Sequence, residues 1–324
     1  MHSIDPAQLL TQPGEPTPAT LRAPIARLLL ATRLPFLTIT LFGALLGIAG
    51  AWSHGVPLNL VGAAATLLLA LITHAAVNVL NDWCDHHNGT DAINTDRIYP
   101  FTGGSRMIQN GVFTAVAMRN FAIALFGIAI GGGLLLTLQV GSGLLLFGIA
   151  GVLIGWAYSA APLALNSRGA GEVCVAAAFW LVVFGADFVQ RTEFSITPLL
   201  IGGAYALLTT NILYINQFPD RAADLAVGKR HWVARLQPST ARWGYVLILL
   251  LAAACVVMPV LLGLLPRLAL LALIGFVPTI PATRCLLANA ATPARLAPAI
   301  QQTIAAAHLT ALCMGIGLVL AAWN

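Results

Sequence analysis

Apolar stretches long enough to cross a lipid bilayer recur along most of the chain, and this pattern limits the folds that it can adopt. A transmembrane helix needs about 20 mostly apolar residues. Only helices and closed barrels satisfy their backbone hydrogen bonds in lipid, and stretches of this length fit helices, so we expect an all-α, polytopic membrane bundle. About nine spans are predicted, at Leu34 to Trp52, Leu58 to Leu80, Met118 to Val140, Leu144 to Ala161, Val173 to Val189, Ile196 to Ile215, Gly244 to Leu262, Leu265 to Leu287 and Gln301 to Trp323.

The composition excludes an ordinary soluble domain. Of the 324 residues, 59% are hydrophobic and 8% are charged, whereas soluble domains average about 45–50% apolar and 25% charged residues. Residues 1–24 contain several prolines and are expected to form a flexible tail, followed by a single transmembrane domain over residues 25–324. Leu21 to Arg33 mixes arginines with leucines, which is typical of a short segment lying on the membrane surface.

The basic residues predict the orientation. With nine spans and a cytoplasmic N-terminus, every Lys and Arg except Arg191 and Arg267 falls in a cytoplasmic segment. We therefore expect a multi-pass protein of the cell membrane, the inner membrane of a bacterium. The net charge of +5 is interpreted as this topology signal and as an attraction to anionic lipid, not as a nucleic-acid-binding surface.

The scarce acidic residues gather in two segments, which are predicted to be cytoplasmic loops after the second and sixth spans. Asp and Glu number only 11 in the whole chain, and charges at a membrane boundary are costly enough to indicate function. In the first segment Asn78, Asp82 and Asp85 share a helical stripe. Gly89 then permits a turn that brings Asp91 back toward them.

The second segment repeats part of this pattern. Asn216, Asp220 and Asp224 lie at i, i+4 and i+8, on one helix face, and Pro219 is expected to kink the helix. Each segment places an asparagine four residues before its leading aspartate. This similarity is a weak internal repeat.

Clustered carboxylates repel one another, so a cation is expected between them. Carboxylate and amide oxygens suit Mg²⁺, which commonly binds through a few carboxylates and substrate phosphates. Cys84, His86 and His87 leave zinc as an alternative. Helix caps or solvated loop charges are the alternative without any metal.

Basic side chains follow both acidic segments and are candidates for binding an anionic substrate. Arg106 comes after Gly103-Gly104-Ser105, and Lys229 and Arg230 follow Gly228. Charge-assisted hydrogen bonds from such groups hold phosphates well. The alternative for each of them is the positive-inside bias alone.

The two motifs, at the ends of the second and sixth spans, resemble those of the UbiA superfamily of intramembrane prenyltransferases. Asn81-Asp82-x-x-Asp85 and Asp220-x-x-x-Asp224, followed by Gly228-Lys229, carry this resemblance over nearly the whole chain beyond the tail. Within this superfamily the chain looks most like the 1,4-dihydroxy-2-naphthoate polyprenyltransferases of menaquinone biosynthesis. The matching features are the spacing to Asp91, Thr102-Gly103-Gly104, Tyr158-x-x-x-Pro162 and Arg168-Gly169-x-Gly171-Glu172.

This chain also departs from those enzymes. It has Gly228-Lys229-Arg230-His231-Trp232 where they usually have Gly-Lys and a Thr-rich stretch, and Asn216-Gln217-Phe218-Pro219 where they usually have Asn-Asn-hydrophobic-Arg. These segments adjoin the predicted substrate loops. The departures therefore affect the identity of the acceptor more than the class of reaction.

The resemblance implies transfer of a polyprenyl group from a prenyl diphosphate to an aromatic acceptor, with two Mg²⁺ ions at the diphosphate. It implies metal binding and catalysis by Asp82, Asp85, Asp220 and Asp224, with Asp91, Asn78 and Asn216 as further metal ligands. Asn81, Arg106, Lys229, Arg230 and Tyr158 are the candidates for substrate binding. Aromatic faces such as those of Tyr158 or Trp83 are candidates for stabilising the allylic cation, although packing at the lipid interface is the alternative role of both.

Other functions remain open from the sequence. A UbiA-type enzyme with a different acceptor, or a terpene cyclase with no acceptor, would share the diphosphate site. A cation or metabolite transporter belongs to a different class, and transporters usually bind near the bilayer midplane through broken helices. Acidic segments at one membrane edge beside basic residues favour capture of an anionic headgroup instead.

Overall fold

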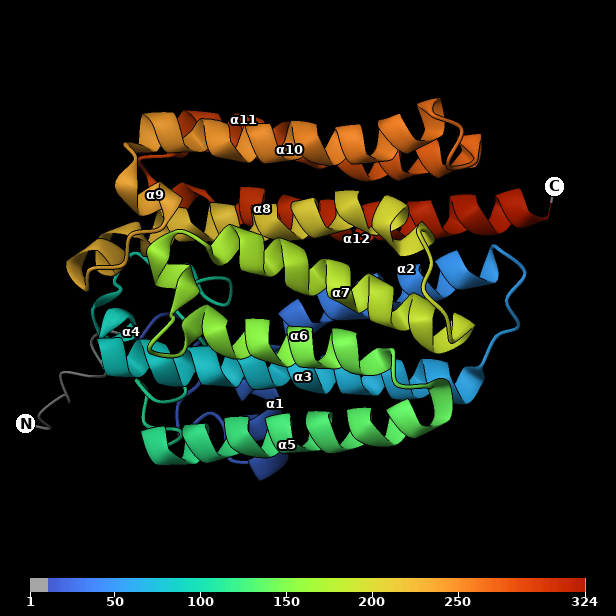
Figure 1. Ribbon diagram of the computed structural model, residues 1–324. Helices are drawn as coiled ribbons and strands as arrows, with labels where there is room; N and C mark the ends of the chain where they lie inside the picture. Colours follow the sequence, from blue (N-terminus) through green and yellow to red (C-terminus); the bar gives the residue numbers. More distant parts are fainter. Residues whose placement is uncertain (1–10, 324) are drawn as a thin grey trace, which may run out of the picture.

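The computed structural model describes residues 11–323, whose regular structure is helical throughout (Figure 1). Among these residues, eight helices are long and apolar enough to cross a membrane. They are α2 (Leu34–Trp52), α3 (Leu60–Asn88), α5 (Ala115–Val140), α7 (Gly171–Arg191), α8 (Thr197–Ala226), α10 (Pro238–Leu261), the segment Arg267–Asn289 and α12 (Ala297–Ala322). A ninth apolar helix, α6 (Leu144–Ser159), has 16 residues, which is shorter than the ~20 needed. A membrane bundle is therefore confirmed, while the count of nine spans stays a prediction.

Helix ends follow local signals. Asn59 accepts a hydrogen bond from Gly62 N at 2.9 Å and caps α3, and Thr114 does the same for α5 from Ala117 N at 3.1 Å. Gly89, with φ of +85°, ends α3 in the left-handed conformation. The chain thus marks its helix boundaries with residues that satisfy or release the terminal backbone groups.

The acidic segments are helical, which corrects the prediction that they are loops. Helix α3 runs to Asn88 and so includes Asp82 and Asp85. Helix α8 continues through Pro219 to Ala226 and includes Asp220 and Asp224. The fall in hydropathy marks where the apolar layer ends and not where the helix ends, and α8 remains helical even through Pro219.

The predicted span Leu265 to Leu287 is divided into two elements. Its first part is the 3₁₀ helix η3 (Arg267–Phe276), and its second is α11 (Thr279–Asn289). Pro278 lies at the junction and Pro281 follows it, and each lacks the N–H that a continuous helix would use. Gly275 of η3 approaches the backbone of Thr310 so closely that a Cβ there would clash.

Helix α8 forms the centre of the bundle. Of its most apolar 18 residues, 78% are buried, and it packs against α2, α7, α10 and α12. Small residues allow these close contacts, since a Cβ at Gly47 of α2 would collide with Val183 O of α7. The central position fixes the end of α8 relative to the other helices.

The short helices α4 (Thr90–Ile93) and α9 (Trp232–Arg235) lie at one end of the bundle, beside the C-terminal ends of α3 and α8 (Figure 1). Helix α1 (Pro24–Ala31) leaves Ile25 and Leu29 exposed, consistent with a segment that lies on the membrane. The tail over residues 1–24 and the single domain over residues 25–324 stay predictions, and residues 1–10 are outside the described part of the chain.

Candidate active site

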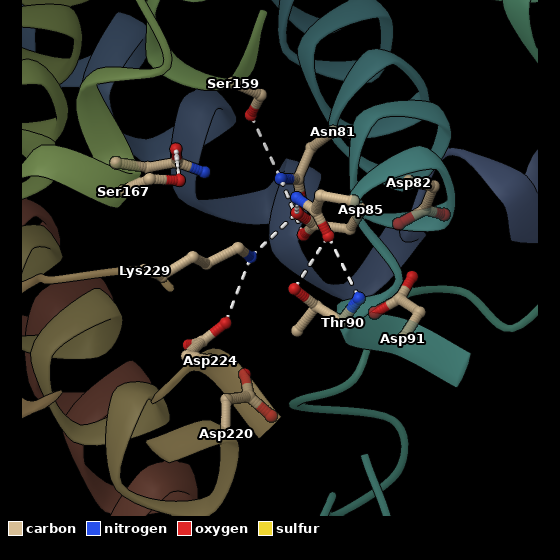
Figure 2. A network of polar contacts seen from close by, with 12 residues as sticks. Asn81, Asp82, Asp85, Thr90, Asp91, Ser159, Ser167, Asp220, Asp224 and Lys229 are labelled. Atoms are coloured by element: carbon tan, nitrogen blue, oxygen red, sulfur yellow. Dashed lines mark hydrogen bonds and ion pairs between the residues drawn. The ribbon is translucent and has the colours of Figure 1, made fainter. Parts of the chain in front are cut away.

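The two acidic segments meet at the end of the bundle where α3 and α8 terminate. Figure 2 shows Lys229 between them. Its Nζ lies 2.7 Å from Asp85 Oδ1 and 3.0 Å from Asp224 Oδ1. Burial alone would lower the pKa of Lys229, but Asp85 and Asp224 outweigh it and hold this pKa above its usual range. The lysine therefore carries its charge between the two segments.

Asp82 is held by a cation and by a backbone amide. Its Oδ1 forms an ion pair with Arg33 Nη2, and its Oδ2 accepts from Ser105 N at 3.1 Å. Arg33 also donates to Asn81 Oδ1 at 3.2 Å. Burial opposes the charge on Arg33, but Asp82 and Asp91 raise the pKa of its guanidinium. Arg33, which precedes the first span, is thus part of the site.

Asp91 comes back to the α3 carboxylates, as the turn at Gly89 predicts. Burial raises the pKa of Asp91 well above its usual value, and the charges of Asp85 and Asp82 add to this effect. Gln109 Nε2 donates to its Oδ2 at 3.3 Å. Gly104 fits between two carboxylates, because a Cβ there would lie 2.7 Å from Asp91 Oδ2 and 3.1 Å from Asp82 Oδ1.

The α8 carboxylates have different partners. Asp220 Oδ1 accepts from Asn94 Nδ2 at 2.6 Å. Asp224 Oδ2 lies 3.0 Å from His231 Nε2, while His231 Nδ1 accepts from Ala234 N at 3.2 Å and caps α9. Since Nδ1 accepts, the ring proton resides on Nε2, which donates to Asp224.

The side-chain oxygens around these carboxylates are suitable ligands for a hard cation. The side-chain oxygens Asn94 Oδ1 and Asn216 Oδ1 are buried and accept no hydrogen bond, and amide and carboxylate oxygens are the ligands that Mg²⁺ prefers. Within residues 11–323, no group of three or more His, Cys, Asp or Glu side chains already has metal-binding geometry. Arg33 and Lys229 supply positive charge at the carboxylates instead.

The remaining predicted residues have varied surroundings. Asn78 Nδ2 donates to Thr32 O at 2.9 Å, and Asn81 Nδ2 reaches Asp85 Oδ2 at 3.1 Å and Ser159 Oγ at 3.0 Å. Arg106 is buried and donates to the backbone oxygen of Asp91. Arg230 is exposed, and its backbone N donates to Ser167 O at 2.7 Å.

The N-terminal segment contributes a residue that sequence reasoning missed. The Glu15 side chain is fully buried, with Oε1 2.6 Å from Arg97 Nε and Oε2 3.9 Å from Arg106 Nε. Arg97 Nη1 in turn donates to Asn94 O at 2.6 Å. Glu15 thus supports the segment that carries Asn94. An acidic residue among prolines offered the only signal, because its partners lie far along the chain.

An apolar cavity of about 510 Å³ adjoins the polar site. It lies among α3, α5, α6 and α7, with His74, Asn78 and Tyr158 among its lining residues. On α3 the lining extends from Asn78 to Thr66, a distance of about 18 Å along the helix axis. The cavity therefore leads from the acidic cluster into the membrane-spanning part of the bundle.

Comparisons with known proteins all lead to prenyltransferases. The model of the UbiA prenyltransferase family matches residues 37–305. The 1,4-dihydroxy-2-naphthoate octaprenyltransferase of Escherichia coli (strain K12) is 28% identical over 267 residues, which cover 79% of this chain and 84% of the relative. The protein of the same name from Bacillus subtilis (strain 168) is 27% identical over 203 residues, 61% of this chain and 62% of the relative.

Two solved structures share the fold. One, from work on digeranylgeranylglyceryl phosphate synthase, has a TM-score of 0.63 and 15% sequence identity, covering 91% of this chain and 99% of its own. The other is a UbiA homologue from Archaeoglobus fulgidus bound to DMAPP and Mg²⁺, with a TM-score of 0.59, 14% identity and the same coverage. At such low identity the likeness concerns the fold alone.

Proposed function

Since the chain belongs to the UbiA prenyltransferase family, we propose that it transfers a polyprenyl group from a prenyl diphosphate to an aromatic acceptor, with Mg²⁺ at the diphosphate. The chain is a prenyltransferase; the donor, the acceptor and the ion are the proposal. The observation that carries it is the buried carboxylate cluster of α3, α4 and α8 at the mouth of an apolar cavity. A prenyl diphosphate has the matching shape, with a charged head and a long apolar tail.

Two Mg²⁺ ions would neutralise the charge that develops on the departing diphosphate. One set of candidate ligands is Asp82, Asp85, Asp91 and Asn78, and the other is Asp220, Asp224 and Asn216. The unpaired oxygens of Asn94 and Asn216 support this assignment, because buried acceptors without donors suit a cation. The Archaeoglobus fulgidus homologues bound to Mg²⁺ and to DMAPP or GPP also support it.

The protein's own side chains have three tasks in this proposal. Lys229 and Arg33 lie close enough to the carboxylates to donate to diphosphate oxygens once ions bind. The apolar cavity holds the prenyl tail and keeps water away from the allylic cation. Tyr158, at the cavity wall, can present its ring face to that cation.

The proposed acceptor is 1,4-dihydroxy-2-naphthoate or a similar quinone precursor, supported by the names of the curated relatives. The test is mass spectrometry of the products that purified protein forms from Mg²⁺, geranyl diphosphate and a panel of aromatic acids. We expect a prenylated naphthoate product. Prenylation of 4-hydroxybenzoate alone would refute the acceptor, and diphosphate release without a coupled product would indicate a terpene cyclase. Ion or metabolite uptake by vesicles without diphosphate release would indicate a transporter.

The active site is proposed to face the cytoplasm. Single cysteines replacing the exposed Ala92 and Ala226, in a background without native cysteines, would be labelled by a membrane-impermeant reagent only in inside-out vesicles. Labelling of both positions from the outside would show that the active site faces away from the cytoplasm and would contradict the proposed orientation. Opposite accessibility of the two positions would separate the acidic segments.

A further inference from the structure

Two buried acceptor oxygens lie one helical turn deeper in the bundle than Asp220. Glu172 Oε1 accepts a hydrogen bond from Gln217 Nε2 at 3.0 Å. Glu172 Oε2 and Gln217 Oε1 are also buried, and neither accepts a hydrogen bond. Buried polar atoms without partners are costly and uncommon. These two oxygens therefore lack a donor, which the described residues do not supply.

The pair lies beside the mouth of the apolar cavity. On α7 the cavity is lined by Val175, Phe179, Val182 and Ala186, and Glu172 continues this stripe toward the acidic cluster at helical spacing. The neighbouring Gly171 faces Tyr158, since a Cβ on that glycine would lie 3.6 Å from the tyrosine ring. Gln217 precedes Asp220 by three residues and shares its side of α8.

The chemistry of the pair selects among the possible occupants. A diphosphate carries no strong donor and would be repelled by the carboxylate, and a prenyl tail has no polar atoms. A metal ion would favour further anionic ligands, but the side chain bonded to Glu172 is the neutral amide of Gln217. An aromatic hydroxyl supplies the missing donor on a flat apolar ring.

We propose that Glu172 and Gln217 bind a hydroxyl group of the aromatic acceptor, and that Glu172 takes the proton of this hydroxyl during prenyl transfer. This inference rests on the proposed function. It assigns the acceptor subsite to the junction of α6, α7 and α8, between the carboxylate cluster and the cavity.

The reaction balances with these groups alone. The allylic C–O bond breaks and its electron pair leaves with the diphosphate, while an acceptor ring carbon uses a π-electron pair to form the new C–C bond. The hydroxyl proton moves to Glu172 Oε2, and the O–H electrons form a ketone. The ring carbon then loses a proton to the departing diphosphate, or loses carbon dioxide, and its electron pair returns to the ring. The ring becomes aromatic again as the ketone oxygen recovers its proton from Glu172.

The surroundings of Glu172 leave its carboxylate available for this step. Tyr158 of α6, Cys174 of α7 and Tyr214 of α8 lie near enough to interact electrostatically with Glu172, and these side chains are neutral at neutral pH. Arg168 of η2 (Leu165–Arg168) is directed elsewhere and donates to Pro162 O at 2.7 Å. Within residues 11–323, Glu172 forms no ion pair.

The test compares Glu172→Gln with the wild type and with Glu193→Gln, a matched change at an exposed glutamate. The substrates are geranyl diphosphate, 1,4-dihydroxy-2-naphthoate and a monomethyl ether of that naphthoate. We expect Glu172→Gln to lower kcat/KM for the naphthoate by roughly 10²-fold, the lower range for general-base catalysis. Donor affinity and the Mg²⁺ requirement should not change, and Glu193→Gln should behave like the wild type.

Two readouts separate proton transfer from a structural role. The rate of Glu172→Gln should rise with pH toward that of the wild type, because a phenolic hydroxyl ionises by itself near pH 10. The wild type should discriminate strongly against the methyl ether, whereas the variant should treat both acceptors alike. Gln217→Met should raise the KM for the acceptor more than it lowers kcat.

Each contrary result has a distinct meaning. Near-normal kinetics of both Glu172→Gln and Gln217→Met would overturn the inference, as would a variant whose defect is a changed Mg²⁺ requirement. Loss of folding in Glu172→Gln, measured by its Tm, would leave the decision to Gln217→Met, and an unchanged acceptor KM in that variant would overturn the inference. Wild-type protein that couples no acceptor would refute the proposed function itself.

Discussion

The acidic clusters of α3 and α8 begin with the same spacing, an asparagine four residues before an aspartate, yet their leading aspartates have different partners. Asp82 has an arginine and the backbone amide of Ser105. Asp220 has the neutral side chain of Asn94. Arg33 therefore compensates the charge of Asp82, the leading acid of the first cluster. The bonded partner of Asp220, the leading acid of the second cluster, is neutral.

The difference shows where additional positive charge is most needed. Lys229 is shared between Asp85 and Asp224, so it compensates each cluster only in part. His231 assists Asp224 but leaves Asp220 without a cation among the described contacts. We therefore expect the α8 cluster to depend more strongly on a bound ion.

The largest expected effect comes from Asp82→Asn and Asp220→Asn, which keep size and hydrogen bonding but remove charge. Each should lower turnover by a factor of about 10² or more, because electrostatic stabilisation of the departing diphosphate is lost. Measurements of prenyl transfer, with Asp96→Asn at an exposed site as the control, would show it. Near-normal transfer by either variant, or full activity in excess chelator, would remove the two-ion proposal.

Lys229→Met removes the cation that joins the clusters. Transfer should fall roughly 10- to 10²-fold, since a charged donor to the diphosphate is lost while the carboxylates remain for metal. Arg119→Met, at an exposed arginine on α5, is the control for loss of charge. If Lys229→Met weakens the response to Mg²⁺ without lowering the saturated rate, the lysine organises the carboxylates and does not bind the diphosphate.

His231→Asn tests the α8 cluster alone. Asparagine can still cap α9, but it is too short to keep the contact with Asp224. The half-saturating Mg²⁺ concentration should rise by a few fold, with the saturated rate nearly unchanged. Identical Mg²⁺ titrations of variant and wild type would show that Asp224 does not need this support.

Much of this arrangement could be predicted from the sequence because it depends on local spacing. The stripes of Asp82 with Asp85 and of Asp220 with Asp224 follow from helical periodicity, and the even number of spans between them places both at one end of the bundle. Their helical spacing was predicted, but they were also expected in loops, because hydropathy reports the edge of the apolar layer and not the end of the helix.

The hydrogen-bond and ion-pair partners of the aspartates could not be predicted, because these contacts depend on tertiary packing. Arg33 reaches Asp82 across 49 residues, and Asn94 reaches Asp220 across 126. Nothing in the local pattern distinguishes Arg33 from an arginine that only follows the positive-inside bias. The pair of Glu172 and Gln217 was hidden for the same reason, since only the fold brings α7 and α8 together there.

The smallest expected effect concerns Glu15, which supports both clusters from a distance. Its partner Arg97 holds the backbone of Asn94. The segment that follows reaches Asp82 through Ser105. Neutralising Glu15 therefore loosens one segment that contacts both leading aspartates.

Glu15→Gln should lower the free energy of unfolding by about 1.5–3 kcal/mol, the range for a hydrogen bond to a charged group. The transfer rate should fall only a few fold, because Asp82, Asp220 and Lys229 all remain. Thermal unfolding in detergent and steady-state transfer, each beside Glu193→Gln, measure the two effects. A large loss of rate with unchanged stability would place Glu15 in the reaction itself, and the two clusters would then no longer be the complete charged site.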